Sequence, residues 1–209
     1  VSINEYLVAV YVWSVYTECM HGMPSERPVR VAVPVNLRPY FNSITTKNFF
    51  VMVSAEFHPT KEIYTFEEVL KSVSESLRSQ ISRENLEKLF SYNVSNEKLL
   101  AARIVPLFLK NLAMRYVYTT SALANTATVT NIGNISVSEE YRPYVEMFHA
   151  FLAMSKGQHL KGTICSYGDT LVFSFSYDLT DTSVQRGFFR KIAADGIAVE
   201  IETNGVNYE

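Results

Sequence analysis

The sequence has few cysteines and lacks any long hydrophobic run. Cys19 and Cys165 are the only cysteines among 209 residues, which argues against a disulfide-based scaffold for a chain of this size. Because their neighbours are apolar or strand-like, we expect both to be buried free thiols. No apolar stretch reaches the roughly 18 residues that a transmembrane helix needs, and the first residues lack the basic region and cleavage site of a signal peptide. We therefore expect a cytoplasmic protein without a membrane span.

A strong charge of either sign is also lacking. The chain has 19 Lys and Arg against 21 Asp and Glu, for a net charge of -2, so no basic field favours a nucleic-acid partner. Hydrophobic residues make up 47% of the chain, which contains 13 Tyr and 13 Phe, enough for a sizeable core and an apolar pocket. Since no Pro-, Ser- or Gly-rich linker divides the chain, residues 1–209 are expected to form one domain.

Known catalytic motifs are absent as well. The four histidines do not stand in the spacing of a zinc site. The sequence contains no G-x-S-x-G elbow, no Walker loop and no G-x-G-x-x-G stretch. From the residues alone, no catalytic side chain, metal site or tightly bound cofactor can be assigned.

Local patterns predict helices and strands in separate groups along the chain. The stretches Ser2 to Glu5 and Thr65 to Glu68 are capping boxes, which mark the starts of helices. Helices are expected from Ser2 to near Gly22, over 65–81, from near Ser95 with Pro106 kinking or splitting it, and over 183–195. Strands are expected over 29–35, 49–57, 126–135 with a turn at 131–134, 144–154 and the two arms of a hairpin at 159–178, with 197–203 as a short strand or tail. This order indicates an α+β fold, a mixed sheet with packed helices.

Two strand ends carry polar residues that look suited to a site. The strand in "VAVPVNLRPYF" ends in Asn36 and Arg38, and the strand in "TATVTNIGNI" contains Thr130, Asn131 and Gly133 near its end. Strand ends of a sheet often face ligands, although ordinary turn residues or a surface arginine would give the same pattern. An arginine beside a buried edge is expected to need an anionic partner, and no acidic residue lies close to Arg38 in the sequence.

Four stretches in order resemble the chloramphenicol acetyltransferase-like superfamily, which includes alcohol O-acetyltransferases and peptide-synthetase condensation domains. They are "SINEYLVA", "VAVPVNLRPYF" followed by "KNFFVMV", "IVPLFLKNLAMRYVY", and "VTNIGNI". The resemblance spans nearly the whole chain. It implies the C-terminal lobe of a CoA-dependent acyltransferase-like two-layer sandwich, with acyl-CoA as co-substrate and a small-molecule hydroxyl or amine as acyl acceptor.

The resemblance also implies which residues support the site. In the family a catalytic His-x-x-x-Asp motif precedes the first of these stretches, and no histidine here is followed by Asp at that spacing. The N-terminal catalytic lobe is therefore expected to be absent from this chain, which alone would be inactive and would expose an apolar face. The family arginine that matches Arg38 pairs with the motif's Asp, so Asn36 and Arg38 are expected to give structural support. Thr130, Asn131 and Gly133 match a segment that faces substrate or CoA.

Three interpretations stay open on the sequence alone. The first is half of an acyltransferase of the alcohol O-acetyltransferase type. The second is a condensation-type domain that uses carrier-protein thioesters, or a degenerate relative that only binds. The third is an unrelated α+β binding or oligomerisation module. The acyl group, the acceptor and the oligomeric state are not determined by these patterns.

Overall fold

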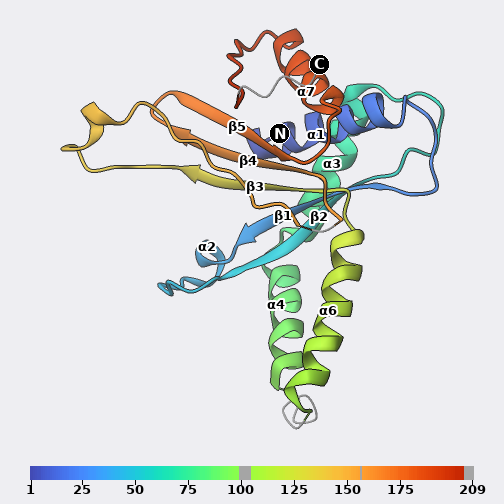
Figure 1. Ribbon diagram of the computed structural model, residues 1–209, viewed down its shortest axis with the longest axis vertical. Helices are drawn as coiled ribbons and strands as arrows, with labels where there is room; N and C mark the ends of the chain where they lie inside the picture. Colours follow the sequence, from blue (N-terminus) through green and yellow to red (C-terminus); the bar gives the residue numbers. More distant parts are fainter. Residues whose placement is uncertain (99–104, 156, 205–209) are drawn as a thin grey trace.

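The fold is built on one five-stranded mixed sheet with the strand order β2-β1-β3-β4-β5 (Figure 1). The computed structural model describes residues 1–98, 105–155 and 157–204. The β1–β2 and β4–β5 pairs are antiparallel, whereas β3 runs parallel to both β1 and β4. The strands are β1 (Val29–Asn36), β2 (Phe50–Phe57), β3 (Ala127–Asn134), β4 (Leu160–Tyr167) and β5 (Thr170–Tyr177). The mixed sheet confirms the predicted α+β class.

Helices α1, α3 and α7 pack against one face of the sheet, whereas α4 and α6 extend away from it (Figure 1). The helical segments are α1 (Ile3–Ser14) with the π-helix η1 (Val15–Cys19), α2 (Arg38–Phe41), α3 (Phe66–Gln80), α4 (Arg83–Lys98), α6 (Leu107–Leu123), the 3-10 helix η2 (Arg142–Tyr144) and α7 (Ser183–Ala194). Both predicted capping boxes are formed, at Ser2 with Glu5 and at Thr65 with Glu68. None of the described helices is long and apolar enough to cross a membrane.

The core lies between the sheet and the three packed helices. Tyr11 of α1 is fully buried, stacks on Phe175 of β5 at 5.9 Å and donates a 3.4 Å hydrogen bond to the Leu160 carbonyl. Phe188 of α7 lies 4.2 Å from the ring of Phe173. These aromatic contacts join both terminal helices to the β4–β5 hairpin and so fix that end of the sheet.

The predicted strand at 144–154 is wrong. Residues 142–144 form η2, and 145–154 make no strand. Both edges of β4 are already occupied, by β3 and by β5, so the segment instead contacts side chains on the sheet face opposite the helices. There Cys165 donates its thiol to the Phe148 carbonyl over 3.1 Å. The apolar pattern of residues 144–154 therefore reflects packing against the sheet and not a strand within it.

Smaller differences concern element ends. Residues 131–134 continue β3 through a bulge instead of forming a turn, and 197–203 form no strand. No helix starts at Ser95, which lies inside α4; Pro106 directly precedes α6, and the predicted helical residues 99–104 lie outside the described part. Both cysteines are free, but Cys19 is exposed because it ends the π-helical turn at the surface, whereas Cys165 is buried as predicted.

Candidate functional site

Arg38 follows β1 and is held by oxygen atoms of its own neighbourhood. Its Nε donates to the Thr45 carbonyl at 3.0 Å, its Nη2 to the Lys47 carbonyl at 2.7 Å and its Nη1 to the Asn36 Oδ1 at 3.2 Å. None of these acceptors is a carboxylate, so main-chain and amide oxygens replace the expected anionic partner. A guanidinium carries five N–H donors, and two of them have no acceptor among the described residues.

Asn36 orients the arginine from the strand side. Its Oδ1 also accepts a hydrogen bond from the Arg38 backbone N–H at 3.1 Å. Between these two residues, Leu37 is completely buried and donates its N–H to the carbonyl of Phe49, the residue before β2. At the end of β1, the side chain of Leu37 is therefore buried, and the polar side chains of Asn36 and Arg38 bond to each other beside it.

The second predicted segment lies in β3. Asn131 accepts a 2.8 Å hydrogen bond from the Gly133 N–H, and the register to β4 shifts between these two residues. Gly133 has a φ of 87°, a conformation that L side chains rarely adopt, and an added Cβ would meet nothing within 4 Å. The glycine is thus required by the bulge. Asn131 is exposed, and Thr130 and Gly133 are partly exposed.

The two predicted segments lie at the same end of the sheet on neighbouring strands. β1 and β3 are parallel, but they pair only at Val31 with Ala127 and at Ala32 with Thr128. Beyond these pairs the strands diverge toward their carboxyl ends, where Arg38 and Gly133 are found (Figure 1). The opening between neighbouring parallel strands is a common place for ligands.

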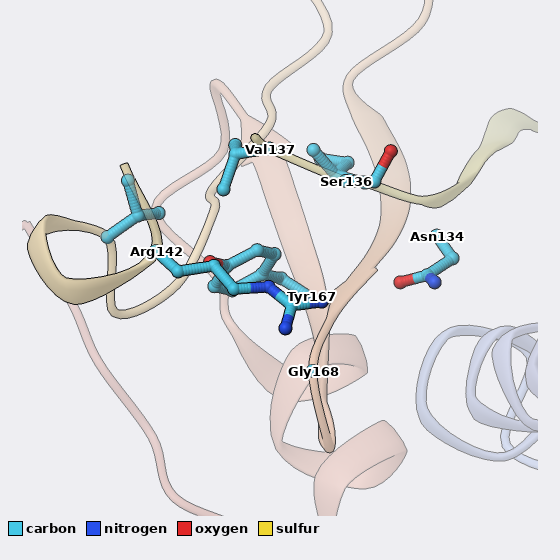
Figure 2. A pocket seen from close by; sticks show the side chains of 8 residues that line it. Asn134, Ser136, Val137, Arg142, Tyr167 and Gly168 are labelled. Atoms are coloured by element: carbon cyan, nitrogen blue, oxygen red, sulfur yellow. The ribbon is translucent and has the colours of Figure 1, made fainter. Parts of the chain in front are cut away.

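A cavity of about 340 Å³ lies where β3 and β4 end (Figure 2). Arg142 of η2 extends into this cavity beside Tyr167, the last residue of β4. The ring of Phe148 holds the Tyr167 ring edge-to-face at 5.3 Å. This cavity was not predicted from the sequence. The signals that could have indicated it are the Arg-Pro turn after the β3 bulge and the Tyr-Gly turn of the hairpin. The lining residues that Figure 2 labels are Asn134, Ser136, Val137, Arg142, Tyr167 and Gly168.

A buried lysine lies on the same sheet face as Cys165. Lys161 of β4 is 8% exposed, and its Nζ donates to the Ala153 carbonyl at 2.8 Å and to the Ser155 hydroxyl at 2.7 Å. Burial lowers the pKa of Lys161. Both acceptors are neutral, so Lys161 forms no ion pair with them. Its hydrogen bonds hold the segment 145–155 against the sheet.

The histidines do not assemble a catalytic group. His58, His149 and His159 each lie near a carboxylate, those of Glu56, Glu202 and Asp178 respectively, and all three are substantially exposed. In the described part of the chain, no group of three or more His, Cys, Asp or Glu side chains could hold a metal ion.

Comparisons with known proteins extend the description of the fold. No protein-family model matches the sequence, and no curated protein matches it either. Among solved structures, the epimerization domain from the third module of tyrocidine synthetase B superposes with a TM-score of 0.54 and 10% identity, covering 93% of this chain and 42% of that one. The wax ester synthase/diacylglycerol acyltransferase from Marinobacter aquaeolei VT8 gives a TM-score of 0.45 at 14% identity, covering 94% of this chain and 44% of that one.

A third match is the condensation domain that mediates chain release from the enacyloxin polyketide synthase, with a TM-score of 0.45, 10% identity and coverage of 99% and 39%. The chain therefore spans less than half the length of each of these structures. Over nearly its whole length, the chain shares the fold of part of that epimerization domain, a mixed sheet with packed helices. This agrees with the fold that the resemblance in the sequence implies.

Proposed function

We propose that the chain is the C-terminal half of an acyltransferase of the alcohol O-acetyltransferase type. The intact enzyme would move an acyl group from a CoA thioester to the hydroxyl or amine of a small molecule. The observation that carries the proposal is the fold match, which covers 93% of this chain but only 42% of the epimerization domain. The four stretches that resemble the superfamily lie in the same order along the chain.

The proposal places the proton transfer in another part of the intact protein. A histidine of a His-x-x-x-Asp motif would take the proton from the acceptor as it attacks the thioester carbonyl. The tetrahedral intermediate would then collapse and release the CoA thiol. This chain would form one wall of the channel between the lobes, with Thr130, Asn131 and Gly133 facing substrate or CoA.

The exposed apolar surface of α6 supports the existence of a second lobe that covers it. Apolar side chains project from several sides of this helix and are exposed, whereas a helix that is hydrophobic on all sides is normally covered. Tyr116, for example, is 72% exposed. The other large exposed apolar side chains of α6 are Leu107, Phe108, Leu109, Leu112, Met114, Val117, Tyr118 and Leu123.

Arg38 would join the two lobes. Its three intramolecular hydrogen bonds fix the guanidinium at the end of β1, and two N–H donors are left for the Asp of the motif. In this role Arg38 positions the catalytic loop and takes no part in proton transfer.

The test uses the full natural protein. It is incubated with acetyl-CoA and a panel of primary alcohols and amines, and the release of free thiol is followed over time. Acceptor-dependent thiol release that disappears when the motif histidine is replaced by alanine is expected. Lack of a His-x-x-x-Asp motif upstream of Val1, or thiol release that does not depend on the acceptor, would refute the proposal.

A second candidate is a condensation-type domain that acts on carrier-protein thioesters, or a relative that only binds such partners. It is favoured by the match to the epimerization domain of tyrocidine synthetase B. The same protein is then offered an acyl group on a phosphopantetheinylated carrier protein in place of acetyl-CoA. Transfer from the carrier protein but not from acetyl-CoA would favour this candidate, and binding without transfer would favour the non-catalytic relative.

A further inference from the structure

Polar side chains line the cavity at the ends of β3 and β4. Asn134, Ser136, Arg142 and Tyr167 all line it, and none of their side chains makes a hydrogen bond or ion pair within the described part of the chain. Four polar side chains therefore line one hollow, and the described part of the chain leaves their hydrogen-bonding capacity unused (Figure 2).

Arg142 differs in this respect from Arg38. The Arg38 guanidinium is engaged by three oxygen atoms of the chain, whereas the Arg142 guanidinium has none among the described residues. The nearest carboxylates along the sequence belong to Glu139 and Glu140, and neither forms an ion pair with Arg142. Among the described residues, no carboxylate neutralises the positive charge at the cavity.

The backbone around the cavity is fixed by hydrogen bonds. Arg142 lies in η2, where its carbonyl accepts the N–H of Val145 at 3.3 Å. On the opposite side, Ile135 donates its N–H to the Ser166 carbonyl at 2.8 Å, which ties the segment after β3 to β4. Together with the Phe148 contact, these bonds place the Tyr167 ring and Arg142 on defined sides of the cavity.

The volume and the walls limit the kind of ligand. About 340 Å³ lies at the lower end of the range of small-molecule sites. Ile135, Val137 and Val145 supply apolar walls beside the polar groups. A guanidinium is well suited to bidentate binding of phosphate or carboxylate oxygens.

We infer that this cavity binds a small organic oxyanion. Its phosphate or carboxylate lies on Arg142, with Asn134 and Tyr167 as further donors, and its apolar part lies on Ile135 and the two valines. The inference does not depend on acyl transfer, because it rests only on the unpaired donors and the walls of the cavity.

The binding test follows backbone amide resonances of the full natural protein during titration with three probes of similar size. These are phenyl phosphate, benzoate and the neutral benzyl alcohol. We expect phenyl phosphate or benzoate to shift the resonances of 134–137 and 167–168, with binding at least about tenfold tighter than that of benzyl alcohol. The tighter of the two anions identifies the class of oxyanion.

Variants connect the binding to the named side chains. Arg142→Gln should weaken anion binding by about tenfold or more, whereas Arg190→Gln, which removes the same charge from an exposed position on α7, should leave it unchanged. Tyr167→Phe keeps the ring against Phe148 and should weaken binding by less than Arg142→Gln does. The inference is overturned if neither anion shifts these resonances, if benzyl alcohol binds as well, or if both arginine variants weaken binding equally.

Discussion

Glu5 of α1 accepts two hydrogen bonds from Arg78 of α3, at 2.6 Å from Nε and at 2.9 Å from Nη2. The same carboxylate closes the capping box by accepting the Ser2 N–H at 2.7 Å. Glu5 is buried, whereas the Arg78 side chain is 62% exposed. One residue therefore fixes the start of α1 and joins it to α3 over the sheet.

This pair predicts a loss of stability in acid. Hydrogen bonds from Arg78 lower the pKa of Glu5 to about 2 from an ordinary value of 4.5. Because the folded-state pKa lies below the unfolded one, the stabilisation is complete above pH 4.5 and is lost as the pH falls toward 2. Thermal unfolding of the natural protein between pH 2 and 7 should show this dependence.

The matched variants are Glu5→Gln and Glu75→Gln. Gln at position 5 can still serve the capping box, so the variant removes mainly the ion pair with Arg78. Glu5→Gln should therefore lower Tm by about 2–4 °C at pH 7, and its Tm should fall less steeply than that of the wild type as the pH decreases. Glu75 pairs with Lys71 at 4.0 Å on an exposed helix face, and Glu75→Gln should change Tm little. Equal Tm values for wild type and Glu5→Gln at pH 7 would contradict the assignment.

Replacement of Arg38 should affect the loop and the activity together. Arg38→Gln removes the bonds to Thr45 and Lys47 and should cost about 2 kcal/mol, since these are hydrogen bonds from a charged group. Amide exchange over 42–48 should accelerate, and turnover by the intact protein should fall. Arg27→Gln, at an exposed position, serves as the control; normal exchange and turnover in Arg38→Gln would show that the assigned role is wrong.

Replacement of Gly133 should lower stability through backbone strain and not through a steric clash. Ala at a φ of 87° is strained, although its Cβ would meet nothing within 4 Å, so Gly133→Ala should cost about 1–2 kcal/mol. Gly133→Asn should cost less because Asn tolerates positive φ better. Chemical denaturation of the three proteins measures the difference, and an Ala variant as stable as wild type would mean that the bulge rearranges freely.

Replacement of Lys161 should change amide exchange nearby and the pH dependence of stability. Lys161→Met removes the bonds to Ala153 and Ser155 and should accelerate amide exchange over 145–155. Because burial lowers the pKa of Lys161 below its ordinary value of 10.5, its contribution to stability should rise as the pH increases from the folded-state pKa toward 10.5. The Met variant should lack this rise, and unchanged exchange over 145–155 would contradict the attachment.

The elements were predictable where local chemistry determines them. The capping residues Ser2 and Thr65 marked two helix starts, and the alternating residues of β5 marked a strand. The segment 144–154 was mistaken for a strand because periodicity reports contact with a sheet but not whether a neighbouring strand edge is available. That information depends on β3 and β5, which occupy both sides of β4.

The candidate site was only partly predictable for a similar reason. The strand ends at Arg38 and Gly133 could be located because their residue types are unusual there. The acceptors of Arg38 could not be predicted, since the Thr45 and Lys47 carbonyls are main-chain atoms that every residue carries. Arg142 was missed because its position opposite Tyr167 depends on a turn that brings distant residues together.

The short ladder of hydrogen bonds between β1 and β3 joins the two parts of the sheet only weakly. Hydrogen bonding between these strands is confined to residues around Val31–Ala127 and Ala32–Thr128, whereas β1–β2 and β4–β5 pair along their whole length. We therefore expect the sheet to resist twisting least along this line, with β2 and β1 on one side and β3, β4 and β5 on the other. A ligand that separates the carboxyl ends of β1 and β3 would therefore displace few backbone hydrogen bonds of the sheet.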